Sequence, residues 1–289
     1  MTPHQKGLLL TGFGGLVLSF DIPLLRLANA DVWTVQFVRP GLGLIMALLI
    51  WGAVSLWRRR AITLLPGKTG ILVALLYGVA STIFVGAIFH TTAANIVFIL
   101  SLNSMFAALL GWLWLGERPA RATLATMAVT VAAVLLIVGD SLHTGNWLGD
   151  LMTLCCAAII ATVITITRRS GRDMGFAPMI GGLLPLAVAA VMLAPQGVTK
   201  LAVENPVWLI LDGGLLIPIS FWCLATGPKY ISGPEVAMFY LFETVLAPVW
   251  MWLVFREAPT PASLAGGVII IAALLAHTAW QYRRLRKRV

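Results

Sequence analysis

The feature that most constrains this chain is an internal repeat, because the second half of the sequence resembles the first at a constant offset, with position 107 matching position 247. Ala107–Leu135 aligns without a gap with Ala247–Leu275, and 11 of the 29 positions are identical. The identical pairs include residue types that are uncommon in apolar helices: Trp112/Trp252, Glu117/Glu257 and Pro119/Pro259. Internal repeats in a membrane protein are typical of secondary transporters, whose substrate site lies between the repeats near the bilayer midplane. The repeat therefore predicts a transporter.

Apolar segments dominate the chain, which is 60% hydrophobic and 11% charged, with a mean hydropathy of +0.94. This composition lies outside the range of soluble domains. Ten stretches are long enough to cross a hydrocarbon core of ~30 Å, and they cover residues 6–28, 32–55, 69–89, 93–115, 120–139, 147–167, 176–194, 206–226, 233–255 and 260–281. The connections are short, so we expect residues 1–289 to form a single all-α membrane domain.

The number of spans fixes how the two halves are related. Residues 1–141 and residues 142–289 each contain five expected spans. Because five is odd, the second half must cross the membrane in the opposite sense from the first. The sequence therefore predicts ten transmembrane helices arranged as two inverted five-helix repeats, related by a pseudo-two-fold axis in the membrane plane.

The basic residues are distributed unequally between the two sides of the membrane. With the N-terminus in the cytoplasm, 16 of the 20 Lys and Arg residues fall on the cytoplasmic side, and only Arg26, Arg39, Lys200 and Arg256 fall elsewhere. The positive-inside rule then places both termini in the cytoplasm. The net charge of +9 is explained by this topology, so we expect no nucleic-acid partner. A signal peptide cut after Ala30 is the alternative for the first span, but its removal would break the five-plus-five repeat.

No pattern of catalytic or metal-binding residues stands out. The three cysteines, Cys155, Cys156 and Cys223, lack metal-ligand spacing, and the four histidines are far apart in the sequence. The usual nucleophile, zinc and phosphate-binding motifs are not found. We therefore expect a protein that is not an enzyme and has no cofactor or metal. Its expected partners are a small-molecule substrate and the lipid bilayer, and a monomer is favoured over a homodimer.

Each repeat contains a Glu-x-Pro hairpin between two spans. Glu117 and Pro119 form the first hairpin, and Glu257 and Pro259 form the second. A proline tolerates the first position of a helix, where its missing N–H is not needed. A glutamate just upstream lies near the positive end of the helix dipole. Two roles remain open for both glutamates: capping a structural hairpin, or contacting the substrate directly.

The sequence around these hairpins resembles that of a known transporter family. An apolar helix that ends in ALLGWLWLGERP, followed by a small-residue helix and repeated in the second half of the chain, resembles the EamA family of the drug/metabolite transporter superfamily. The chain is most similar to the YddG-type aromatic amino-acid exporters of that family. The resemblance covers essentially the whole chain. One departure is that family members usually carry a proline in the helix before the hairpin glutamate, at the positions that Ser104 and Thr244 occupy in this chain.

The resemblance implies a multi-pass transporter of the bacterial inner membrane. It implies export of small metabolites, most of all amino acids with aromatic side chains favoured, by alternating access around a central cavity. Organic-cation or multidrug efflux is the alternative within the same superfamily. A zwitterion would need a cationic partner such as Arg39, an anionic partner such as Glu243 or Asp21, and an aromatic pocket.

Polar side chains at helical spacing mark two expected spans as the walls of such a cavity. In the span 233–255, Glu235, Phe239 and Glu243 fall on one helical face, and Tyr240 is three residues from Glu243. Ionisable residues inside spans are functional candidates because they are costly to bury. The alternative role is hydrogen bonding between helices. The equivalent positions of the first repeat, in the span 93–115, are Asn95, Ile99 and Asn103.

A second candidate site lies in the first two spans. Asp21 and Arg39 lie at about the same depth, 10–12 Å from the outer end, on consecutive antiparallel spans, so the sequence predicts a salt bridge between them. Asp212 lies at a similar depth and can join them. The pair either locks a structural hairpin or binds the substrate carboxylate through Arg39. Tyr77, near the middle of its span, completes the candidates because a buried phenol needs a hydrogen-bond partner that a cavity can supply.

Overall fold

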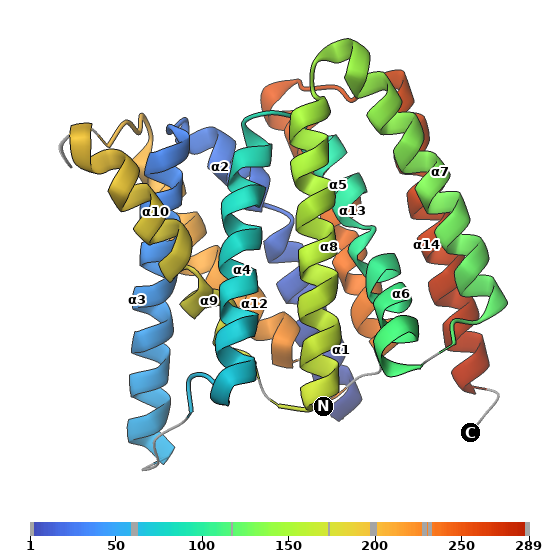
Figure 1. Ribbon diagram of the computed structural model, residues 1–289, viewed down its shortest axis with the longest axis horizontal. Helices are drawn as coiled ribbons and strands as arrows, with labels where there is room; N and C mark the ends of the chain where they lie inside the picture. The colour runs from blue at the N-terminus through green and yellow to red at the C-terminus, as the bar shows by residue number, and fades with distance from the viewer. Residues whose placement is uncertain are drawn as a thin grey trace.

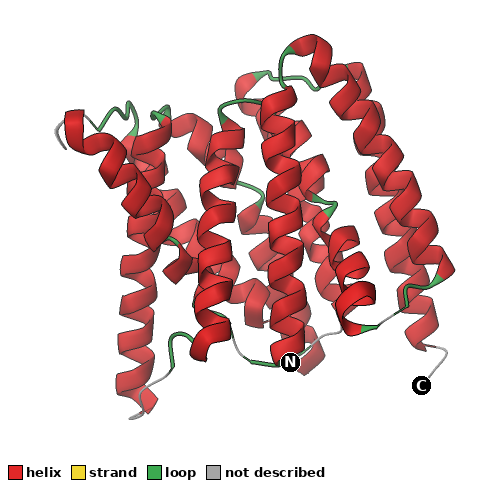
Figure 2. Cartoon of the chain, viewed as in Figure 1, coloured by secondary structure: helices red, strands yellow, loops and turns green. Residues whose placement is uncertain are grey.

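The structure, a computed structural model, describes residues 3–58, 63–116, 118–172, 174–196, 201–226, 230 and 233–286, which form a helical bundle (Figures 1 and 2). The helices are α1 Pro3–Leu18, α2 Asp21–Ala28, α3 Val32–Arg58, α4 Gly67–Ile88, α5 Ala93–Leu100, α6 Asn103–Leu115, α7 Arg121–Thr144, α8 Trp147–Ser170, α9 Ala177–Gly181, α10 Leu183–Leu193, α11 Pro206–Leu211, α12 Ile217–Thr226, α13 Gly233–Phe255 and α14 Pro261–Arg286. A 3₁₀ turn η1 (Ala194–Gln196) follows α10, and a π-helix η3 (Asp212–Leu216) separates α11 from α12. The described residues form no strand, and only an isolated bridge joins Ala30 to Val203.

The prediction of an all-α membrane protein is confirmed. Eight of the described helical segments are long and apolar enough to cross a membrane, and two shorter apolar helices cover Ala177–Leu193 and Phe242–Phe255. The two shorter helices lie inside the expected spans 176–194 and 233–255. The count of ten spans and the inverted relation between the halves stay predictions.

Local sequence signals explain where several helices begin. The Asp31 carboxylate accepts hydrogen bonds from the backbone N–H groups of Trp33 (2.8 Å) and Thr34 (3.2 Å) at the start of α3. Thr260 caps α14 through a 3.1 Å bond from the backbone N–H of Ser263. These side chains satisfy N–H groups that have no partner inside the helix. Local hydrogen bonds therefore explain why α3 and α14 begin close to these residues.

Helices of the two halves pack against one another throughout the bundle. α4 lies along α8, α7 along α14, α3 along α10, and α1 along both α12 and α13. In each of these pairs one helix comes from residues 1–141 and the other from residues 142–289. Figure 1 shows that α1 begins and α14 ends at the same end of the bundle. Neither half therefore buries its apolar surface alone.

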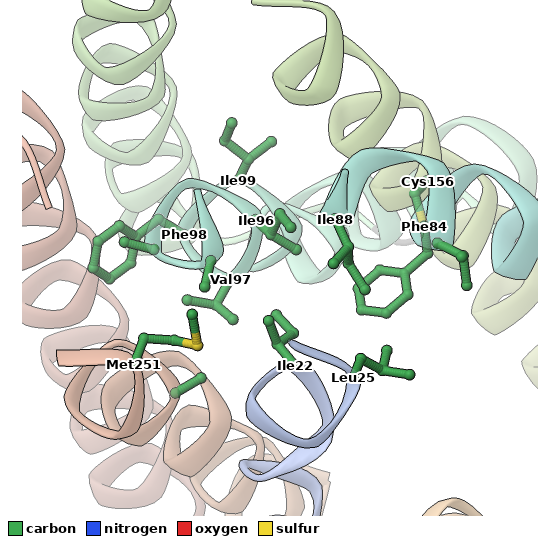
Figure 3. Packing of buried hydrophobic residues seen from close by; sticks show 14 of the residues in the cluster. Ile22, Leu25, Phe84, Ile88, Ile96, Val97, Phe98, Ile99, Cys156 and Met251 are labelled. Atoms are coloured by element: carbon green, nitrogen blue, oxygen red, sulfur yellow. The ribbon is translucent and has the colours of Figure 1, made fainter. Parts of the chain in front are cut away.

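The hydrophobic core lies where α2, α5 and α13 meet. Ile22 of α2, Val97 of α5 and Met251 of α13 are each at most 2% exposed and point toward one another (Figure 3). A second cluster, centred on Val73 and Val163, fills the contact between α4 and α8. The outward-facing side chains of the bundle are largely apolar, as a bilayer requires.

Four of the membrane segments are not continuous α-helices. Two-residue turns separate α1 from α2 at Ser19–Phe20 and α5 from α6 at Ser101–Leu102, and Gly182 separates α9 from α10. The fourth interruption is the π-helix η3. At the α5–α6 break, a side chain donates a hydrogen bond to a backbone carbonyl: the Ser101 hydroxyl donates to the Phe98 carbonyl at 2.6 Å. Non-helical backbone at membrane depth is tolerated where protein or a cavity surrounds it.

Glycines allow α13 to approach α1. A Cβ on Gly15 would lie 2.4 Å from the backbone oxygen of Phe239, and one on Gly12 would lie 3.0 Å from the Phe239 ring. We expect Gly15→Ala to lower the unfolding free energy by about 1–3 kcal/mol, because the added methyl group cannot fit without moving α13. Thermal unfolding of the detergent-solubilised protein measures this. Gly52→Ala in α3 is the matched control, since its Cβ would meet nothing within 4 Å. Equal losses in the two variants would contradict the close contact.

Candidate functional site

A buried ion cluster joins three membrane segments. Nη2 of Arg39 lies 2.6 Å from Oδ1 and 2.7 Å from Oδ2 of Asp21, and Nε of Arg39 donates to Oδ2 of Asp212 at 2.7 Å. The three residues are 9%, 4% and 0% exposed, in the order Arg39, Asp21 and Asp212. The predicted Asp21–Arg39 salt bridge is confirmed, and Asp212 joins it. We call these three residues the Arg39 cluster.

Irregular backbone positions two members of the Arg39 cluster, and the third lies beside a proline. Asp21 begins α2 immediately after the turn that ends α1, Arg39 precedes Pro40 inside α3, and Asp212 is the first residue of the π-helix η3. Gly213 brings η3 against α3, since a Cβ there would lie 2.7 Å from the Arg39 carbonyl oxygen. π-helical turns occur frequently at functional sites. The cluster therefore lies where two membrane segments depart from regular helix, at the turn before Asp21 and at the π-helix that begins with Asp212, and next to a proline in the third.

The formal charges of the Arg39 cluster do not balance. It contains one guanidinium and two carboxylates, so it carries a net charge of −1 when all three groups are ionised. Oδ1 of Asp212 has no hydrogen-bond partner among the described residues, although it is fully buried. No described hydrogen bond uses Nη1 of Arg39, and the guanidinium lies 5.8 Å from the Phe84 ring centroid. Within the described part of the chain, the cluster thus keeps one free acceptor and one free donor.

Glu243 of α13 adds a third carboxylate beside the Arg39 cluster. It lies close enough to interact electrostatically with Asp21 and Arg39, and it is partly exposed. No hydrogen bond or ion pair of Glu243 occurs within the described residues. The structure therefore brings three of the predicted site residues, Asp21, Arg39 and Glu243, into one region.

An aromatic contact next to this region was missed from the sequence. The Phe20 and Trp250 rings stack with centroids 4.8 Å apart, and the Trp250 indole N–H donates to the Ser19 hydroxyl at 3.0 Å. These contacts tie the α1–α2 turn to α13. The position equivalent to Trp250 in the first repeat is Leu110, so the repeat gave no signal for this residue.

The other predicted cavity residues are dispersed. Phe239 packs against α1 and meets Phe242 edge-on, with ring centroids 5.6 Å apart. Tyr77 packs in the second hydrophobic cluster beside α9. Ile99 is fully buried in the main hydrophobic cluster. Asn103 is half-buried and begins α6, just after the α5–α6 turn. The side chains of Tyr240 and Glu235, and the whole of Glu117, lie outside the described residues.

Asn95 belongs to a separate polar network rather than to the region of Glu243. Its amide donates to Ser141 of α7 at 3.0 Å and to both oxygens of Asp150 of α8 at 3.2 Å, and it accepts from Ser263 of α14 at 2.6 Å. All four side chains are at most 2% exposed. This network holds α5, α7, α8 and α14 together by hydrogen bonds between helices.

Glu257 has a different partner from the one that the hairpin suggested. Its Oε1 accepts a 3.3 Å hydrogen bond from the backbone N–H of Ala93, the first residue of α5. A carboxylate at this position stabilises the helix N-terminus. Glu257 therefore contributes to capping α5, a helix of the other half. Pro259 lies in the same connection and precedes α14, which begins with Pro261; in the first hairpin Pro119 precedes α7.

A cavity of about 620 Å³ opens between the start of α4 and the last turns of α6 and α8. Its lining includes Trp114 and Arg169, and none of the predicted site residues belongs to it. The Arg39 cluster, by contrast, is closed off by protein in this conformation, since each of its members is at most 9% exposed.

Comparison with known proteins gives matches that cover most of the chain. The EamA-like transporter family model matches residues 5–139 and again residues 147–278. The pseudopaline exporter CntI of Pseudomonas aeruginosa (strain UCBPP-PA14) is 24% identical over 279 residues, which are 94% of this chain and 95% of that protein. A "Probable terminal-alkyne amino-acid exporter" of Streptantibioticus cattleyicolor is 26% identical over 201 residues, 64% of each chain. A crystal structure with 17% identity covers 97% of this chain and 99% of its own, with a TM-score of 0.68, which shows a shared fold.

Proposed function

We propose, from the premise that this chain belongs to the EamA-like transporter family, that it exports small zwitterionic metabolites, most of all amino acids, across the bacterial inner membrane. Members of this family are transporters and not enzymes. One relative is named a pseudopaline exporter and another a "Probable terminal-alkyne amino-acid exporter", and the second name supports a small molecule that carries amino and carboxylate groups.

The Arg39 cluster is the observation that carries this proposal. Ionisable side chains inside membrane spans face the protein interior and mark substrate pathways. Arg39 keeps Nη1 for a substrate carboxylate, while Glu243 makes no described ion pair and can accept a substrate ammonium. The stacked Phe20 and Trp250 rings next to the α1–α2 turn favour an aromatic side chain. Efflux of organic cations is the second candidate, because three carboxylates accompany a single guanidinium in this region.

Alternating access between two inverted five-helix repeats is the mechanism that we propose. The family model matches each half separately, and the helices of one half pack on those of the other. The excess of basic residues on one side supports cytoplasmic termini. The midspan turn before Asn103 and the π-helix at Asp212 supply irregular backbone of the kind that transporters place at their sites.

Transport by the purified protein in liposomes tests the proposed function. The panel contains radiolabelled aromatic and aliphatic amino acids and cationic dyes, each with and without excess unlabelled compound. We expect counterflow of aromatic amino acids to exceed that of the other compounds. Empty liposomes are the control for leakage. If only the dyes are transported, the function is organic-cation efflux and not amino-acid export. No counterflow with any compound would contradict both candidate functions.

A further inference from the structure

The Arg39 cluster lacks one positive charge. The charged groups that interact with Asp212 in the described part of the chain are Asp21 from α2 and Arg39 from α3, and Glu243 from α13 interacts with these two. α11 carries no ionisable side chain, and α12 carries only the thiol of Cys223, at its far end from Asp212. An uncompensated carboxylate is costly at this depth because water is not there to solvate it. The closed conformation therefore needs one more cation beside these residues.

Of the three carboxylates in this region, Asp212 has the geometry that suits this additional cation. Both carboxylate oxygens of Asp21 receive hydrogen bonds from Nη2 of Arg39, as expected for an ionised acid. Asp212 uses only Oδ2 for Arg39, while its Oδ1 is buried and has no described partner. Glu243 does not share the guanidinium of Arg39, which pairs with Asp21 and Asp212. Asp212 also lies beside Asp21, so two carboxylates that approach each other share one guanidinium.

We propose that the closed, substrate-free transporter holds one proton on Oδ1 of Asp212, and that this proton is exchanged for exported substrate. This inference rests on the proposed export function and adds the coupling ion to it. With the site open outward, Asp212 takes a proton from external water and becomes a neutral acid. With the site open inward, the O–H bond breaks, the proton passes to cytoplasmic water, and Asp212 becomes a carboxylate as substrate enters. One proton then moves inward for each substrate molecule that moves outward.

The first test compares stability at different pH values and needs no substrate. Asparagine imitates a protonated aspartate, so Asp212→Asn should unfold within a few degrees of the wild-type protein in mildly acidic detergent solution. As the pH rises, the wild-type protein should lose stability and Asp212→Asn should lose less. Asp21→Asn removes the ionised partner of Arg39, so it should unfold at a lower temperature at every pH. Glu204→Gln, an exposed acid outside the cluster, is the matched control.

An ionised Asp212 predicts the opposite pattern. Asp212→Asn would then break an ion pair and destabilise the protein as much as Asp21→Asn does, with the same pH dependence as the wild-type protein. That result would overturn the proposal. Because this comparison uses purified protein alone, it decides the inference even if no compound of the transport panel moves.

The second test measures coupling in liposomes with radiolabelled phenylalanine, with the membrane potential clamped to zero by potassium and valinomycin. For one proton per substrate, a gradient of one pH unit supports about tenfold accumulation. We expect wild-type protein to approach this value and Asp212→Asn to show no accumulation, while slower exchange of labelled for unlabelled phenylalanine continues. Equal accumulation by the two proteins would place the coupling proton elsewhere. Exchange without accumulation by the wild-type protein would leave the export function intact and overturn the proton coupling.

Discussion

Arg39→Ala is expected to reduce the unfolding free energy of the purified protein by about 3–5 kcal/mol, because it leaves the carboxylate of Asp21 buried without its cation. Folded yield and the thermal unfolding midpoint in detergent measure the loss. Arg256→Gln is the control, since Arg256 is exposed and only stacks over Trp252 at 5.9 Å. A loss as small as that of the control would mean that the Arg39 cluster contributes little to the fold.

A double-mutant cycle separates the ion pair from general effects of each substitution. Asp21→Asn in the Arg39→Ala background removes the stranded charge, so part of the loss should be recovered, with a coupling energy of about 1 kcal/mol or more. Losses that simply add would show that Asp21 and Arg39 do not interact energetically, despite their separation of 2.6 Å.

Glu243→Gln is expected to lower the initial rate of amino-acid counterflow by about tenfold or more, which corresponds to about 1.4 kcal/mol. The reason is that the amide keeps the shape of the side chain but loses the charge that pairs with a substrate ammonium. The protein should stay monodisperse, since Glu243 makes no hydrogen bond within the described part of the chain. Glu204→Gln, at an exposed position, should transport like the wild-type protein.

Thiol labelling separates cavity lining from packing between helices. In a background without the native cysteines, cysteines at positions 103 and 243 should react with small water-soluble reagents, and substrate should slow the reaction. Position 99 is fully buried in the closed conformation and serves as the internal comparison. If positions 103 and 243 resist labelling in every condition and Glu243→Gln loses folded protein, the two residues are packing elements and the cavity lies elsewhere.

Much of the candidate site could be predicted because the depth of a residue in the membrane follows from its position along its helix. A helix rises about 1.5 Å per residue, so counting from the span ends placed Asp21, Arg39 and Asp212 at one level, and an unpaired charge at that level is too costly to leave alone. The direction of each side chain was harder to predict. Asn95 and Glu243 belong to equivalent helical stripes in the two repeats, yet Asn95 lies in a network with Asp150 and Glu243 lies beside Arg39.

The sequence by itself determined the apolar helices, the repeat and the pairing of Asp21 with Arg39. Each of these depends on residue type and on distance along the chain. Only the tertiary structure decided that regular helix is interrupted before Asp21 and at Asp212, that Glu257 caps α5 and that one oxygen of Asp212 lacks a partner among the described residues. A turn or a π-helix inside a span depends on which neighbouring groups satisfy the released backbone, and those neighbours come from distant parts of the chain.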